Sequence, residues 1–138
     1  METRSLVKTL ALLNAGALIC SVCWEFVFLT IGSPEEYTTA KSALAGIEFI
    51  SDAALPYFTG VVLLTLSAHL ISLFLIFKLK NFGRKLFIYA TIIFLVLALF
   101  SGYYVQEPIA DVLVSISEML AGALIVVIYF TDAKKLFA

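Results

Sequence analysis

Few side chains in this sequence could do chemistry, and Glu118 is the most unusual of them. It lies about ten residues into an apolar stretch at 109–131, near the middle of a bilayer-spanning helix. An ionised carboxylate is costly at that depth, so we expect Glu118 to be protonated, paired or in contact with water. His69, the single histidine, lies in another apolar stretch and is the one interior partner that could also carry charge. The two residues predict either a packing contact or a proton- or cation-linked site.

Other polar and small residues recur at helical spacing in the apolar stretches. Three sets each share one helix face: Asn14, Leu18, Ser21 and Glu25; Thr65, His69 and Ser72; and Asp111, Ser115, Glu118 and Gly122. We expect these faces to meet inside a bundle, because small and polar residues commonly pack membrane helices together. The intramembrane polar site predicted from them consists of Glu118, His69, Glu25, Ser115 and Asn14.

Cys20 and Cys23 form a Cys-Ser-Val-Cys sequence inside the first apolar stretch. The spacing permits a membrane thiol oxidoreductase, but such an enzyme passes electrons to a second thiol pair, and the sequence has no other cysteine. The favoured interpretation is that both are small packing residues. One histidine and two thiols match neither heme nor zinc ligation, so we expect no metal, no cofactor and no catalytic residues.

The elements that must position these residues follow from composition. The chain has 138 residues, of which 62% are apolar and 14% charged, whereas soluble domains are about 45–50% apolar and about 25% charged. Four apolar stretches, at roughly 6–31, 55–77, 86–105 and 109–131, are each long enough to cross a bilayer. We therefore expect an all-α polytopic membrane protein, a single domain over residues 1–138 that forms an up-down bundle of four transmembrane helices.

The basic residues predict the direction of these spans. All Lys and Arg except Lys41 fall on one side: Arg4, Lys8, Lys78, Lys80, Arg84, Lys85, Lys134 and Lys135. The positive-inside rule then places both termini in the cytoplasm, and we expect the protein in a bacterial inner membrane. The segment from Lys78 to Lys85, which contains Asn81 and Gly83, is expected to be a short cytoplasmic turn.

The segment between the first two spans is acidic. Ser33-Pro34-Glu35-Glu36 is typical of a helix start, and charge recurs at helical spacing as far as Asp52. We expect an extracytoplasmic amphipathic helix over residues 34–52, which either lies at the lipid headgroups or recognises a partner. The candidate partner-facing residues are Glu35, Glu36, Glu48 and Asp52.

The leading functional hypothesis is a non-enzymatic protein that acts by binding within the membrane, as an accessory subunit or an immunity-type protein. Its partners would be the lipid bilayer and either further copies of the chain or a larger membrane complex. The formal charge of −1 gives no sign of a nucleic-acid partner. The alternatives are a small transporter or channel that uses Glu118 and His69, and a thiol oxidoreductase that uses Cys20 and Cys23. Gly122, between two alanines, would allow the close approach of a second helix.

Overall fold

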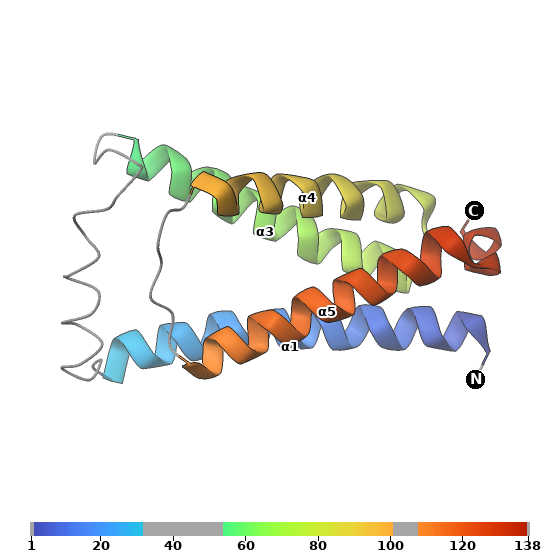
Figure 1. Ribbon diagram of the computed structural model, residues 1–138, viewed down its shortest axis with the longest axis horizontal. Helices are drawn as coiled ribbons and strands as arrows, with labels where there is room; N and C mark the ends of the chain where they lie inside the picture. The colour runs from blue at the N-terminus through green and yellow to red at the C-terminus, as the bar shows by residue number, and fades with distance from the viewer. Residues whose placement is uncertain (1, 32–53, 101–107, 138) are drawn as a thin grey trace.

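The computed structural model describes residues 2–31, 54–100 and 108–137, whose regular structure is entirely helical. The elements, in chain order, are α1 (Thr3–Ile31), α3 (Leu55–Phe77), α4 (Asn81–Phe100), α5 (Pro108–Phe130) and the short 3₁₀ helix η2 (Asp132–Leu136) (Figure 1). Among the described residues, four helices are long and apolar enough to cross a membrane: Thr3–Val27, Pro56–Phe77, Asn81–Leu99 and Pro108–Phe130. The expected all-helical chain with four candidate spans is confirmed.

The amphipathic helix expected at 34–52 lies outside the described residues and stays a prediction, as do its acidic side chains Glu35, Glu36, Glu48 and Asp52.

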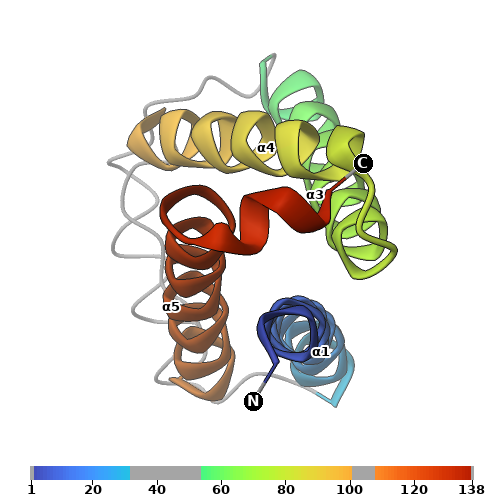
Figure 2. The same cartoon turned by 90° about the vertical axis from the view of Figure 1, so that its right-hand side faces the viewer.

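The four long helices pack as two pairs. The most extensive contacts join α1 to α5 and α3 to α4, and a smaller contact between α1 and α3 connects the pairs. The two pairs lie closest together at the end that holds both termini and diverge toward the opposite end (Figures 1 and 2). We call the former end the basic end, because it holds the start of α1, the α3–α4 turn, the start of α4 and η2, and the eight basic residues other than Lys41 lie on these segments.

The hydrophobic core lies toward the basic end and draws on every described helix. Its buried members are Val7, Ala11, Leu73, Ile76, Phe87, Ala121, Leu124, Ile128, Ala133 and Phe137. On α5 the buried positions 117, 121, 124 and 128 follow the spacing of one helix face. Larger apolar side chains, such as Leu64 on α3 and Leu99 on α4, point outward, as expected for helices that face lipid.

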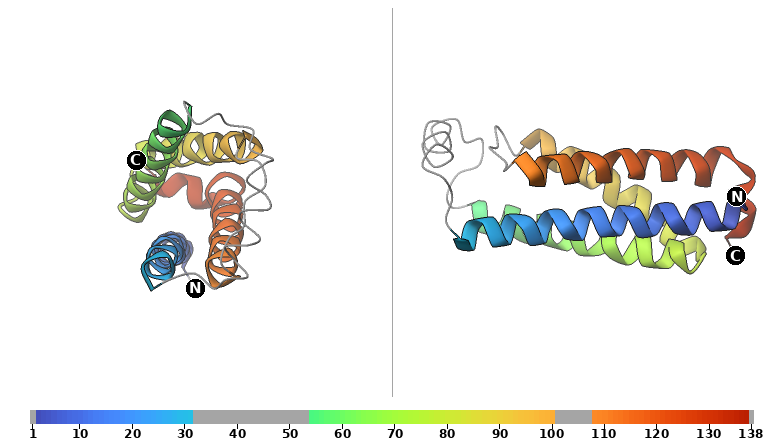
Figure 3. Two further views of the ribbon diagram at one scale, coloured as in Figure 1. Left: turned by 90° about the vertical axis from the view of Figure 1, so that its left-hand side faces the viewer. Right: turned by 90° about the horizontal axis from the view of Figure 1, so that it is seen from below.

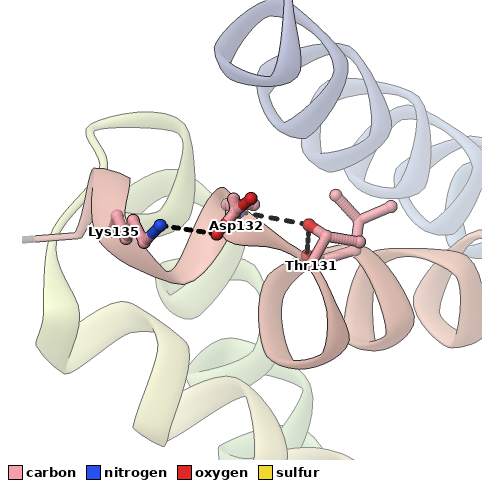
Figure 4. A network of polar contacts seen from close by, with 5 residues as sticks. Thr131, Asp132 and Lys135 are labelled. Atoms are coloured by element: carbon pink, nitrogen blue, oxygen red, sulfur yellow. Dashed lines mark hydrogen bonds and ion pairs between the residues drawn. The ribbon is translucent and has the colours of Figure 1, made fainter.

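The C-terminal segment closes the basic end. Thr131 caps η2 by accepting a hydrogen bond from the Ala133 backbone N–H at 3.1 Å, and an exposed Lys135–Asp132 ion pair lies on its outer side (Figure 4). Phe137 is buried in the core, with the Arg84 guanidinium 5.6 Å from its ring centroid. The segment thus folds back across the bundle toward α3 and α4, as the views of Figures 2 and 3 show.

The turn between α3 and α4 is shorter than the Lys78–Lys85 segment expected for it. Backbone hydrogen bonds from Lys80 N to Leu75 O (2.9 Å) and from Leu79 N to Ile76 O (2.8 Å) end α3, with Leu79 at φ 58°. This is the pattern of a Schellman cap, which takes only one left-handed residue. The expectation was wrong because α4 already begins at Asn81: its first turn is charged, and long basic side chains can reach the interface from inside a helix.

Gly83 is consequently a helix residue and not a turn residue. A Cβ atom added at this position would lie 2.9 Å from the backbone nitrogen of Ile76, with Leu75 closer still. The glycine therefore permits the close approach of α4 to the end of α3.

Candidate functional site

A hydrogen bond between two buried side chains joins α1 to α5. The Ser117 hydroxyl donates to Asn14 Oδ1 at 3.0 Å, and Asn14 and Ser117 are 0% and 6% exposed. The Asn14 Nδ2 has no hydrogen-bond partner within the described part of the chain. Asn14 was among the predicted site residues, whereas Ser117 was not.

Ser115, which was predicted, and Ser117, which was not, lie on different faces of α5. Ser115 shares a face with Asp111, Glu118 and Gly122, and all four are exposed. The expectation that this face meets the other polar faces in the bundle interior was wrong, because α5 buries the neighbouring face instead. The signal for that face was present in the sequence: Ser117, Ala121, Leu124 and Ile128 form an uninterrupted small and aliphatic row.

The other hydroxyl-bearing residues of the interior are satisfied within their own helices. Ser21 donates to the Leu18 carbonyl at 2.9 Å and Thr65 to the Val61 carbonyl at 2.8 Å. Such bonds back to the preceding turn are usual for serine and threonine in membrane helices. These residues contribute packing and leave no hydroxyl proton for a ligand.

His69 occupies a different position, between the two helix pairs. Its side chain is 6% exposed, 4.8 Å from the Phe87 ring and 6.0 Å from the Phe94 ring between centroids. Its Nδ1 is buried and has no hydrogen-bond partner among residues 2–31, 54–100 and 108–137. A buried polar atom without a partner is costly in a folded protein, so His69 carries an unsatisfied hydrogen-bonding group in the interior.

A groove of about 360 Å³ lies beside His69, chiefly between α4 and α5. Its polar lining consists of His69, Thr91, Ser117 and Glu118, and its apolar lining of Leu18, Phe94, Leu95, Ala98, Val114, Ala121, Gly122 and Ile125. The groove exists because α4 and α5 do not pack along their lengths as the other neighbouring pairs do within the described residues. It therefore brings together Glu118 and His69, the two residues that the sequence put forward for charge-linked chemistry.

Glu118 lies on the exposed rim of this groove, at the eleventh position of the 23-residue α5. Within the described residues it makes no hydrogen bond and no ion pair, either with His69 or with any other side chain. A carboxylate at mid-span without a partner is expensive in lipid.

The remaining predicted residues lie apart from the groove. Ser115 is exposed and does not line it, and Glu25 is partly buried farther along α1. Cys20 and Cys23 are free thiols, exposed on α1, and neither lines the groove.

The described residues contain no group of three or more His, Cys, Asp and Glu side chains placed to hold a metal ion. The groove can bind a small ligand, because it offers a carboxylate, an imidazole and two hydroxyl oxygens among mainly apolar side chains. Comparisons with protein-family models, with curated proteins and with solved structures give no match.

Proposed function

We propose that the protein is non-enzymatic and acts by binding within the membrane, as an accessory subunit or an immunity-type protein, with the groove and the exposed face of α5 as its contact surface. The observation that supports this function most directly is Glu118, exposed at mid-span without a partner in the described chain. Polar groups in hydrocarbon need partners, and a binding partner would supply one. Asp111, Ser115 and Gly122 extend the same surface along α5.

A photocrosslinking experiment tests the proposal in native membranes. A photoreactive residue replaces Met119, which is 75% exposed beside Glu118, and in a matched variant it replaces Leu64, which is 73% exposed on α3 at a similar depth. We expect a discrete protein adduct from position 119 and only lipid adducts from position 64.

The mass of the adduct identifies the partner class. A product of twice the mass of the chain indicates a homo-oligomer, and any other discrete product indicates a complex with a different membrane protein. Lipid adducts alone at position 119, or equal protein adducts at both positions, would contradict the proposal.

The same groove favours a second candidate, a small proton- or cation-linked transporter or channel. Its supporting observation is that Glu118 and His69 line one groove. In proteoliposomes, Glu118→Gln should then abolish ion-linked flux while the helical spectrum is retained, because glutamine can neither release a proton nor hold charge. Unchanged flux in this variant would remove the candidate.

We also propose that the basic end faces the cytoplasm. The basic residues other than Lys41 lie on the start of α1, the α3–α4 turn, the start of α4 and η2, all at one end of the bundle (Figure 1). Basic residues are retained on the cytoplasmic side of a bacterial inner membrane, so this orientation is the one that the charges support.

A further inference from the structure

We propose that the groove between α4 and α5 binds the ammonium head of a lipid-soluble primary amine whose alkyl chain extends sideways into the bilayer. The inference rests on the proposed function, binding within the membrane at this face, and names the chemistry of the ligand. The supporting observation is that the polar side chains lining the groove have hydrogen-bond acceptors without partners among the described residues.

Both hydroxyl groups of the groove already donate a hydrogen bond to another atom of the protein. Thr91 donates to the Phe87 carbonyl at 2.9 Å, and Ser117 donates to Asn14 Oδ1 at 3.0 Å. A hydroxyl has one proton but two lone pairs, so both oxygens can now only accept. A ligand that meets them must bring N–H or O–H donors.

Glu118 adds the charge. Its carboxylate on the groove rim accepts hydrogen bonds and attracts a cation, and no described residue provides one there. A primary ammonium carries three donors and a positive charge, which match the acceptor character of the carboxylate and of the two hydroxyl oxygens. Neutral ligands would leave the carboxylate unpaired, and a quaternary ammonium would leave the hydroxyl oxygens without donors.

His69 adds a polar side chain of α3 to the groove lining. The side chain is 6% exposed, lines the groove, and has a buried Nδ1 without a partner among the described residues. Unmet hydrogen-bonding capacity is unusual in a buried imidazole. The groove thus receives polar groups from α3, α4 and α5.

The size and position of the groove select the ligand's shape. A volume of about 360 Å³ falls in the range of small-molecule sites and is too small for a helix, whose diameter is about 10–12 Å. Leu95 and Gly122 are exposed at the groove, so it opens at the side of the bundle. In a membrane that side faces lipid, and an alkyl chain can continue outward among the acyl chains.

The test compares three probes of equal chain length on the full-length protein in nanodiscs of zwitterionic lipid, with empty nanodiscs as blanks. Dodecylamine is protonated at neutral pH, as a lysine side chain is. Dodecyltrimethylammonium keeps the charge but has no N–H donor, and dodecanol has a donor but no charge. Isothermal titration below the micelle concentration gives Kd for each. We expect dodecylamine to bind at least tenfold tighter than either of the others.

Two variants locate the effect. Glu118→Gln should lose the tenfold preference for the amine. Asp132→Asn, which removes the same charge from an exposed position of η2 outside the groove and outside the contact surface of α5, should keep it. Equal binding of the three probes to the unmodified protein, a preserved preference in Glu118→Gln, or an equal loss in Asp132→Asn would overturn the inference. If Glu118→Gln does not fold, the three-probe comparison on the unmodified protein decides. No preference for the amine in the unmodified protein, with crosslinking at position 119 intact, would reject this inference and leave the proposed function standing.

Discussion

At the residue scale, the hydrogen bond between Ser117 and Asn14 connects buried side chains of two different helices. It is buried, and it joins helices at opposite ends of the chain. In hydrocarbon neither group has water as an alternative partner, although a chain unfolded within the membrane finds other partners. Such bonds are accordingly worth only about 1 kcal/mol, but they fix the rotation of one helix against another.

Replacing Ser117 by alanine should therefore lower the free energy of unfolding by about 1 kcal/mol. The substitution removes the donor and leaves Asn14 Oδ1, which is fully buried, without its partner. The measurement is a reversible unfolding titration in mixed micelles. Ser115→Ala, two residues away on the exposed face, is the matched control and should leave the stability unchanged. Equal effects of the two substitutions would show that the bond contributes nothing of its own.

The same two serines mark how far the site could be predicted. Glu118 and His69 were identified because ionisable residues are rare in apolar stretches, and the groove does bring them together. Ser117 was missed because a polar row at helical spacing, from Asp111 to Gly122, looked like an interior face. In a membrane helix the polar row can instead face a groove. The rotation of the helix depends on which of its apolar rows packs best against the neighbouring helices, and the sequence of one helix does not show which row that is.

At the element scale, the α3–α4 hairpin depends on a close backbone approach. Gly83 sits where a Cβ atom would collide with Leu75 and with the backbone of Ile76. The three-residue turn from Lys78 to Lys80 leaves α4 no freedom to move away, because its cap hydrogen bonds fix the end of α3. The boundaries of the other helices were predictable from the lengths of the apolar stretches. This turn was not, because charged residues and glycine are typical of turns and also of a helix that begins at the membrane interface.

Gly83→Ala should destabilise the protein by about 1–3 kcal/mol, the usual range for an overpacked contact. Gly122→Ala is the control, since nothing lies within 4 Å of a Cβ atom added there. Thermal denaturation in detergent, followed by circular dichroism, distinguishes them. A Gly83→Ala protein as stable as Gly122→Ala would show that the hairpin relaxes without cost.

At the scale of the whole molecule, the chain crosses the bundle four times and returns both ends to the same side (Figure 1). Charge alone predicted which residues share that side, because basic residues flank alternate ends of the apolar stretches. The pairing of α1 with α5 and of α3 with α4 was harder to predict from the sequence. Short connections predict antiparallel neighbours, but they do not predict that α4 and α5 remain unpacked against each other.

Reporter fusions test the orientation. An alkaline phosphatase fused at Ala138 should be inactive and a fluorescent protein at the same position should be bright, because both report a cytoplasmic location. Insertions of the same reporters after Thr38 should give the opposite pair of signals. Identical signals at the two positions would contradict the three crossings expected between them, and reversed signals would place the basic end outside.

The hydrophobic core joins the two helix pairs at one end of the bundle. The two helix pairs meet through buried side chains at the basic end, among them Phe137 of the C-terminal segment, while the groove lies between helices that diverge beyond it (Figure 1). Small rotations about a packed end become larger displacements farther along the helices, which is how hinge motions open and close sites. Phe137 does not line the groove, yet it belongs to the core that joins the two pairs, and we expect it to influence the angle between them.

Phe137→Ala should accordingly weaken dodecylamine binding several-fold without touching any group in contact with the ligand, while Lys134→Ala, at an exposed position of the same segment, should not. Distances between spin labels on α4 and α5 should broaden in the first variant and stay narrow in the second. The width of the groove between α4 and α5 would then depend on how residues 131–137 pack at the basic end. A molecule that binds this segment from the adjoining aqueous compartment would change the groove from a distance.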